Sequence, residues 1–198
     1  CRSLEYAYFP FDAPGFSLVL CDSGVKHTLV DSEYNTRRAE CEEGVAVLKK
    51  YDSGISSLRD VSPALLKKHE QMLRPVVFRR CKYVVVEIAR VELACAALQR
   101  NDFATLGQLM FQTHDGLNIE YEVSVPEINF LVETARNNPM VLGARMMGGG
   151  FGGCTINLVK TEALEDFIQT TSVAYATKFG ITLKTYPVKL TAGTSVIK

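Results

Sequence analysis

The sequence predicts an α+β fold. In its middle part, apolar residues recur at the spacing of amphipathic helices, whereas both ends carry short runs of branched apolar and aromatic residues that are typical of strands. A dense cluster of glycines separates two of the C-terminal runs and indicates a turn. Helices combined with mostly antiparallel strands define the α+β class.

Two strands are expected near the N-terminus, over residues 5–11 and 16–21. Both runs are rich in aromatic and branched residues, and Asp12-Ala13-Pro14-Gly15 between them consists of turn-forming residues. The later expected strands cover residues 142–147, 154–159 and 182–190.

The helices are expected from apolar periodicity and from their start signals. Asp31 or Ser32 can cap the first one, Ser62 precedes a proline, and Ser124 with Glu127 forms a capping box. The two long central helices read as an antiparallel hairpin. The expected helices cover residues 31–50, 63–73, 125–136 and 161–179, and the two long central ones carry apolar stripes over residues 84–98 and 103–117.

Composition excludes several classes of function. The chain has 22 basic and 22 acidic residues, so it carries no electrostatic signature for nucleic acid or for an anionic membrane. It has no apolar run near the roughly 20 residues that span a bilayer and no targeting segment, which favours a cytoplasmic protein. Because its cysteines and histidines are scattered, we expect no metal site and buried, reduced thiols rather than disulfides.

The glycine cluster at residues 148–153 is the strongest local signal. Consecutive backbone amides in such a loop can form a concave nest for a phosphate, while a glycine-rich hairpin or a close packing contact is an equally good interpretation. The Walker pattern is absent, since no Gly-Lys-Ser/Thr follows. The candidate residues are Gly148, Gly149, Gly150, Gly152 and Gly153.

A second candidate lies in Ser32-Glu33-Tyr34-Asn35-Thr36-Arg37-Arg38, at the start of the first helix. Tyr34 offers a flat apolar ring and one hydroxyl, which suit the face and the hydroxyls of a sugar. The alternative is a capped helix start exposed to solvent.

Together these segments resemble the galactokinases, members of the GHMP small-molecule kinase superfamily. Arg145-Met146-Met147 followed by the glycine cluster and Cys154 is similar to the third superfamily motif, and the segment around Tyr34 is similar to the sugar-side segment. Three further matches occur in family order: Asp22 to His27, Arg79 to Glu87, and Thr113-His114 leading to Glu122-Val-Ser-Val-Pro-Glu127.

The resemblance implies transfer of the γ-phosphoryl group of ATP, assisted by Mg²⁺, to the anomeric hydroxyl of galactose. It implies that Tyr34 lines the galactose pocket and that the five glycines support the phosphate end of the site. For the fold it implies a GHMP kinase C-terminal domain, a ferredoxin-like βαβ unit with added helices, over residues 29–198. Residues 1–28 are then the last strands of an N-terminal domain.

Several family features are missing. The substrate-binding Gly-Glu-His-Thr-Asp segment, the glycine-serine phosphate loop and the catalytic aspartate segment are not in the sequence, and Met147 stands where the family has threonine. The chain begins at Cys1, so we expect these parts, including the ATP and Mg²⁺ ligands, upstream in an N-terminal domain. No catalytic or metal-binding residue is assigned here, and the chain alone is expected to be inactive.

Two alternatives remain. A galactokinase-like sensor would bind sugar and nucleotide and regulate a partner without turnover. A kinase of the same superfamily would act on N-acetylgalactosamine, arabinose or mevalonate instead of galactose.

Overall fold

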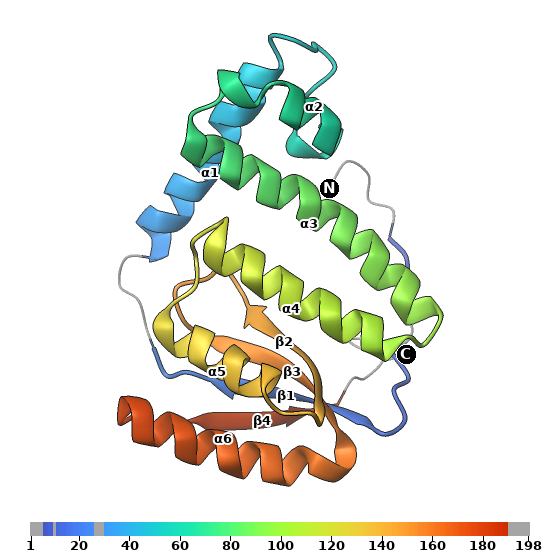
Figure 1. Cartoon of the computed structure of the whole chain (residues 1–198), viewed down its shortest axis with the longest axis vertical. Coiled ribbons are helices and arrows are strands. Elements are labelled where there is room, and N and C mark those ends of the chain that lie inside the picture. Colours follow the sequence, from blue (N-terminus) through green and yellow to red (C-terminus); the bar gives the residue numbers. More distant parts are fainter. Residues whose placement is uncertain (1–5, 10, 26–29, 190–198) are drawn as a thin grey trace, which may run out of the picture.

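The computed structural model describes residues 6–9, 11–25 and 30–189. One antiparallel sheet contains all four strands of these residues, in the order β2-β3-β1-β4 (Figure 1). The strands are β1 (Phe16–Asp22), β2 (Val141–Met147), β3 (Cys154–Lys160) and β4 (Lys184–Val188).

The helices follow the expected order. Short 3-10 turns cover Leu58–Asp60, Glu70–Met72 and Thr161–Ala163. The α-helices are α1 (Val30–Leu48), α2 (Pro63–Lys68), α3 (Pro75–Gln99), α4 (Phe103–Ile119), α5 (Pro126–Arg136) and α6 (Leu164–Phe179). In the described part of the chain, each helix is too short or too polar to cross a membrane.

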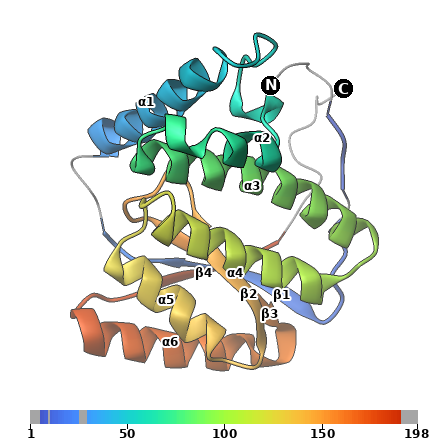
Figure 2. The same cartoon turned by 45° about the horizontal axis from the view of Figure 1, so that its top comes forward.

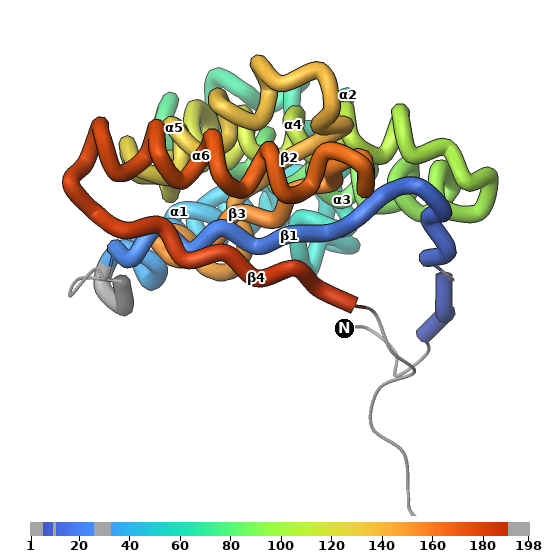
Figure 3. The backbone as a smooth tube through the Cα atoms, turned by 90° about the horizontal axis from the view of Figure 1, so that it is seen from below, coloured from blue at the N-terminus to red at the C-terminus, as the bar shows by residue number. Residues whose placement is uncertain are grey.

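The strand order confirms the α+β class and the ferredoxin-like unit. β1 leads through α1–α5 to β2, β2 and β3 form a hairpin, and α6 connects β3 to β4, which is the split βαβ arrangement. Helices α1–α4 are the added ones. Figure 3 shows α5 and α6 on the same side of the strands.

The position of β1 bears on the predicted domain division. This strand pairs with both β3 and β4, and its buried residues Val19 and Cys21 belong to the same core as α5 and α6. The sheet therefore includes residues 16–22, which the division at residue 28 assigns to another domain. Where the whole protein divides into domains stays a prediction.

A second core lies apart from the sheet. Apolar residues of α1, α2 and α3, among them Leu48, Leu66 and Val77, bury one another at one end of the molecule (Figure 2). Helices α3 and α4 run side by side as the predicted hairpin. α4 reaches the sheet at β2, where a side chain on Gly107 would lie 2.1 Å from the carbonyl oxygen of Leu142.

Three local predictions were wrong. The described residues 6–9 and 11 of the expected first strand lie outside any strand, and α2 ends at Lys68, before the expected end at residue 73. Ser124 does not cap α5, because its hydroxyl donates instead to the Asn129 side chain at 2.6 Å. Ser62 does cap α2, accepting from the Leu65 amide at 3.1 Å. The predicted caps Asp31 and Ser32 have side chains outside the described part.

Candidate functional site

Tyr34 lies in the second turn of α1, and 53% of its surface is exposed. On the following turn, Arg37 is buried, and its guanidinium donates to the carbonyl oxygens of Tyr121 at 2.8 Å and Glu122 at 3.0 Å. Arg37 thus anchors the N-terminal half of α1 to the connector between α4 and α5. Tyr34 therefore projects from a helix whose position is fixed by its buried neighbour.

The glycine cluster forms the loop between β2 and β3, where most of its glycines have positive φ. At Gly150, φ is +102°, and a side chain there would lie 2.7 Å from the carbonyl oxygen of Val123. At Gly152, φ is +127°, and a side chain would lie 2.6 Å from the carbonyl oxygen of Val25. These two glycines are required by backbone conformation and close packing.

The first two glycines of the loop have different surroundings. A side chain added at Gly148 or Gly149 would meet nothing within 4 Å. At the other end of the loop, the carbonyl oxygen of Gly153 accepts hydrogen bonds from the amide and the hydroxyl of buried Ser23, at 2.9 and 2.8 Å. The loop is thus held at Gly150–Gly153, whereas its backbone at Gly148–Gly149 is accessible.

The connector Tyr121–Val123 links Tyr34's helix to this loop. Its carbonyl oxygens at Tyr121 and Glu122 accept hydrogen bonds from Arg37. Its carbonyl oxygen at Val123 accepts a hydrogen bond from the Phe151 amide at 2.7 Å. Figure 1 shows the connector and the β2–β3 loop on the side where α1 begins. One short segment therefore sets the relative positions of the two candidate elements.

Arg80 of α3 holds the connector in place. Its side chain is 2% exposed, and its guanidinium reaches Glu40 at 3.0 Å, Glu122 at 2.5 Å and the carbonyl of Glu120 at 2.5 Å. Glu122 has a φ of +54°, an uncommon conformation for a residue with a side chain. The bonded Arg80 guanidinium keeps the pKa of the Glu122 carboxyl below its ordinary value, so the pair stays charged at neutral pH.

The sequence interpretation assigned no role to these supporting residues. Arg37 and Glu122 lie inside segments that resemble family motifs, and Arg80 lies in the quoted stretch 79–87, so a signal existed. Ser23, which holds Gly153, lies in another of these segments. The spatial relation between these segments could not be predicted from the sequence, because it depends on contacts between residues that are distant along the chain.

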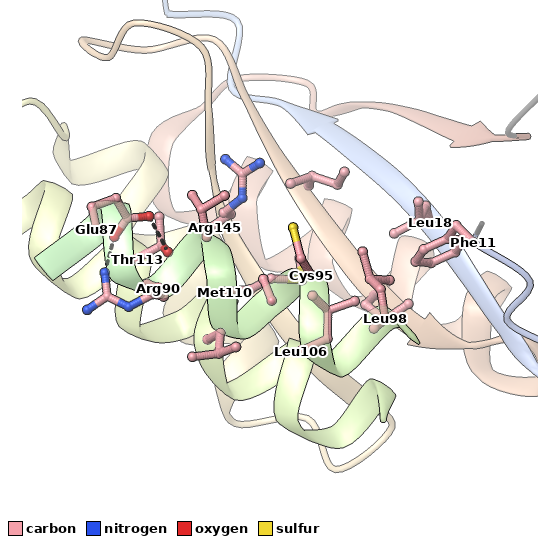
Figure 4. Close-up of a pocket in the computed structure, with 15 residues that line it drawn as sticks. Phe11, Leu18, Glu87, Arg90, Cys95, Leu98, Leu106, Met110, Thr113 and Arg145 are labelled. Carbon is pink, nitrogen blue, oxygen red and sulfur yellow. Dashed lines mark hydrogen bonds and ion pairs between the residues drawn. The ribbon is translucent and has the colours of Figure 1, made fainter. Parts of the chain in front are cut away.

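The candidate residues do not line the apolar cavity beside the α3–α4 hairpin. That cavity, of about 440 Å³, lies between the α3–α4 hairpin and the strands (Figure 4). Leu18 and Leu106 contribute to its apolar wall, and at one end Glu87 accepts from the Thr113 hydroxyl at 2.8 Å and pairs with Arg90. Arg145 also lines this cavity and donates to the Met146 carbonyl oxygen at 2.9 Å, whereas Tyr34 and the loop glycines are not among its lining residues.

Comparison with protein families identifies a domain within the chain. Residues 94–171 match the family described as GHMP kinases C terminal. This range contains α4, α5, the β2–β3 hairpin and the glycine loop. The fold and the family match therefore agree with the predicted domain type.

Curated relatives match over nearly the whole chain. A galactokinase of Chloroflexus aggregans is 41% identical over 196 residues, which are 99% of this chain and 50% of the relative. A galactokinase of Homo sapiens is 43% identical over 163 residues, 82% of this chain and 40% of the relative. The chain thus spans about half the length of the curated relatives it matches.

Solved structures give the same result. The crystal structure of Lactococcus lactis galactokinase complexed with galactose matches with a TM-score of 0.90 and 29% identity, over 94% of this chain and 48% of that one. A mevalonate kinase of L. major in complex with R-mevalonate matches with a TM-score of 0.54 and 22% identity, over 90% of this chain and 44% of that one. The second likeness concerns the fold alone.

We predict that Arg80→Met destabilises the protein far more than Arg79→Met. Both arginines pair with Glu122, but Arg80 is 2% exposed and Arg79 is 46% exposed. Removing Arg80 leaves Glu40, whose side chain is 14% exposed, with only a longer contact to Arg37 at 3.8 Å, and it removes the donor to the Glu120 carbonyl. We expect this loss to cost about 3 kcal/mol, whereas an exposed pair contributes at most about 1 kcal/mol. Urea unfolding of both variants measures the difference, and equal losses would contradict the role of Arg80.

Proposed function

We propose that this chain, which carries a GHMP kinase C-terminal domain, is the C-terminal part of a galactokinase. The observation that carries this proposal is the likeness to galactokinases across almost the whole chain, at 41% identity and, for a solved structure, a TM-score of 0.90. In the full-length protein, the reaction is transfer of the γ-phosphoryl group of ATP to the anomeric hydroxyl of galactose. The protein acts in the cytoplasm, in galactose metabolism.

Tyr34 contributes to the galactose pocket in this proposal. Its exposure leaves the ring face and the hydroxyl free for a sugar, while Arg37 on the next turn keeps the helix fixed. An aromatic ring and one hydroxyl provide an apolar surface and an oriented hydrogen bond. Phosphoryl transfer depends chiefly on positioning and charge stabilisation, so a rigid sugar pocket contributes directly to rate.

The glycine loop supports the phosphate end of the site, and its two halves do so differently. Gly150, Gly152 and Gly153 hold the loop against the connector and the segment after β1. Gly148 and Gly149 keep an accessible backbone, which permits the close approach of a phosphate or of a neighbouring segment that holds one.

ATP and Mg²⁺ are the proposed phosphoryl donor and metal ion, and their principal ligands lie outside this chain. When bound, Mg²⁺ would neutralise the charge that develops on the transferring phosphate. Among the described residues, Asp, Glu, His and Cys side chains do not gather in a group of three that fits a metal, so we assign none of them to Mg²⁺. The catalytic base is likewise not assigned to this chain.

We predict that the isolated chain shows no galactose-dependent ATP consumption, because it supplies one part of a two-part site. A coupled assay of ADP formation measures this, with the full-length protein as the positive control. Turnover by the chain alone would contradict the prediction. A full-length protein that binds galactose and ATP without turnover would instead be the sensor, and better use of N-acetylgalactosamine, arabinose or mevalonate would identify another substrate.

In the full-length protein, Tyr34→Ala is expected to raise the KM for galactose about tenfold, which corresponds to about 1.4 kcal/mol of lost binding. The matched control is Tyr51→Ala, because Tyr51 is also half exposed, at 52%, but lies past the C-terminal end of α1. Steady-state kinetics with varied galactose measures both variants. An unchanged KM for Tyr34→Ala, or equal effects in the two variants, would argue against the sugar pocket.

Substitutions in the glycine loop should separate its two roles. Gly152→Ala is expected to lower stability by about 1–3 kcal/mol, because the side chain clashes with Val25 at a positive φ. Gly149→Ala should leave the unfolding midpoint unchanged but lower kcat/KM for ATP at least about tenfold, by displacing the phosphate. If Gly149→Ala has normal kinetics, this half of the loop has no phosphate role.

A further inference from the structure

Helices α1 and α3 cross at a point that is fixed by charged residues. The carboxylate of Glu40 lies 3.0 Å from the guanidinium of Arg80, and Glu43 pairs with Arg74 through two hydrogen bonds of 2.8 and 2.6 Å. These pairs bring one face of α1 against the first half of α3. Cys41 directly follows Glu40, and Cys81 directly follows Arg80.

Two cysteines lie near each other at this crossing. The Cys81 side chain is fully buried, and its sulfur would lie 2.2 Å from a side chain added at Gly44, one turn after Cys41. Gly44 thus lets the helices approach closely at the sulfur. Cys41 packs against the same core cluster that contains Cys81, and both cysteines are free.

The surroundings of Cys41 make it the more reactive of the two. It is partly exposed, its sulfur lies 3.9 Å from the Tyr121 hydroxyl, and the cation of Arg80 is close. The neighbouring Cys81 thiol lowers the pKa of the Cys41 thiol, whereas Cys41 and burial raise the pKa of Cys81. A thiolate that is accessible and has a thiol neighbour matches the pattern of redox-sensitive cysteines.

We propose that Cys41 and Cys81 form a reversible disulfide, which cross-links α1 to α3 when the protein meets hydrogen peroxide. The Cys41 thiolate attacks one peroxide oxygen, the O–O bond breaks, and a sulfenic acid and, after protonation of the departing hydroxide, water result. The Cys81 sulfur then attacks the sulfenic sulfur, the S–O bond breaks, and its thiol proton leaves with the hydroxyl as a second water. Two electrons pass from the sulfurs to the peroxide.

This cross-link would act on the helix that carries Tyr34. In the reduced protein, polar contacts of Arg37, Glu40 and Glu43 fix α1 against its neighbours. A covalent bond at Cys41 adds a tie at the crossing point, and a small thiol such as dithiothreitol removes it by exchange. The site therefore responds to the redox state without involving a substrate.

Peptide mapping tests the cross-link. The full-length protein is treated with hydrogen peroxide, remaining thiols are blocked with N-ethylmaleimide before unfolding, and the digest is analysed by mass spectrometry. We expect a Cys41–Cys81 peptide pair two hydrogens lighter than its separate parts, which disappears after dithiothreitol. The oxidised protein should melt about 5 to 15 °C higher, because the bond restricts the unfolded chain.

Two variants serve as controls. Cys41→Ser should abolish the linked peptide, while Cys95→Ser, in the second half of α3, should retain it. The peptide analysis of the unsubstituted protein detects the cross-link directly. The proposal can therefore be tested even if a substitution impairs folding. Oxidation of Cys41 to sulfinic acid without a linked Cys81, or an unmodified Cys41 at peroxide levels that oxidise the methionines, would overturn the proposal.

Discussion

The buried guanidinium of Arg80 is the interaction on which the rest of the candidate site depends. A charge withdrawn from water must be paired and hydrogen-bonded. Arg80 meets this requirement with Glu40 of α1 and with Glu120 and Glu122 at the end of α4, so it joins three segments, α3 included. Because each of these groups has to reach the same buried cation, the three segments can assemble in only one relative arrangement. Arg80 thereby fixes geometry as much as stability.

The backbone of the connector links Arg80 to the two candidate elements, α1 and the glycine loop. The connector held by Arg80 presents successive carbonyl groups, two to Arg37 and one to Phe151, so α1 and the glycine loop share one support. The proposed sugar contact and the proposed phosphate contact therefore lie on segments that cannot shift independently. For a phosphoryl transfer, in which acceptor and donor must be aligned, such common support is an advantage.

Local patterns were sufficient to predict most elements, because α4, α5 and the β2–β3 hairpin follow from periodicity and turn residues near in the sequence. The type of domain was predictable from the residues around Tyr34 and Gly148–Gly153, taken together. The place of β1 between β3 and β4 was not, since strand pairing between distant segments leaves no local signal. The role of Arg80 was not predictable either, because its importance depends on Glu40 and Glu122, which are far from it in the sequence. Ser124 shows a different limit: Asn129, within α5 itself, accepts from the hydroxyl that a cap would use.

The central position of β1 also affects how the protein is made. Its hydrogen-bonding partners are more than a hundred residues away, as the 130-residue separation of Ser23 and Gly153 illustrates. During synthesis, β1 leaves the ribosome long before β3 and β4 exist, so its two partners in this sheet are absent until the rest of the chain is made. Such non-local pairing slows folding, and an unpaired apolar strand is prone to aggregation. The helices between β1 and β2 can form early, so this sheet closes last, around the member strand that is synthesised before the other three.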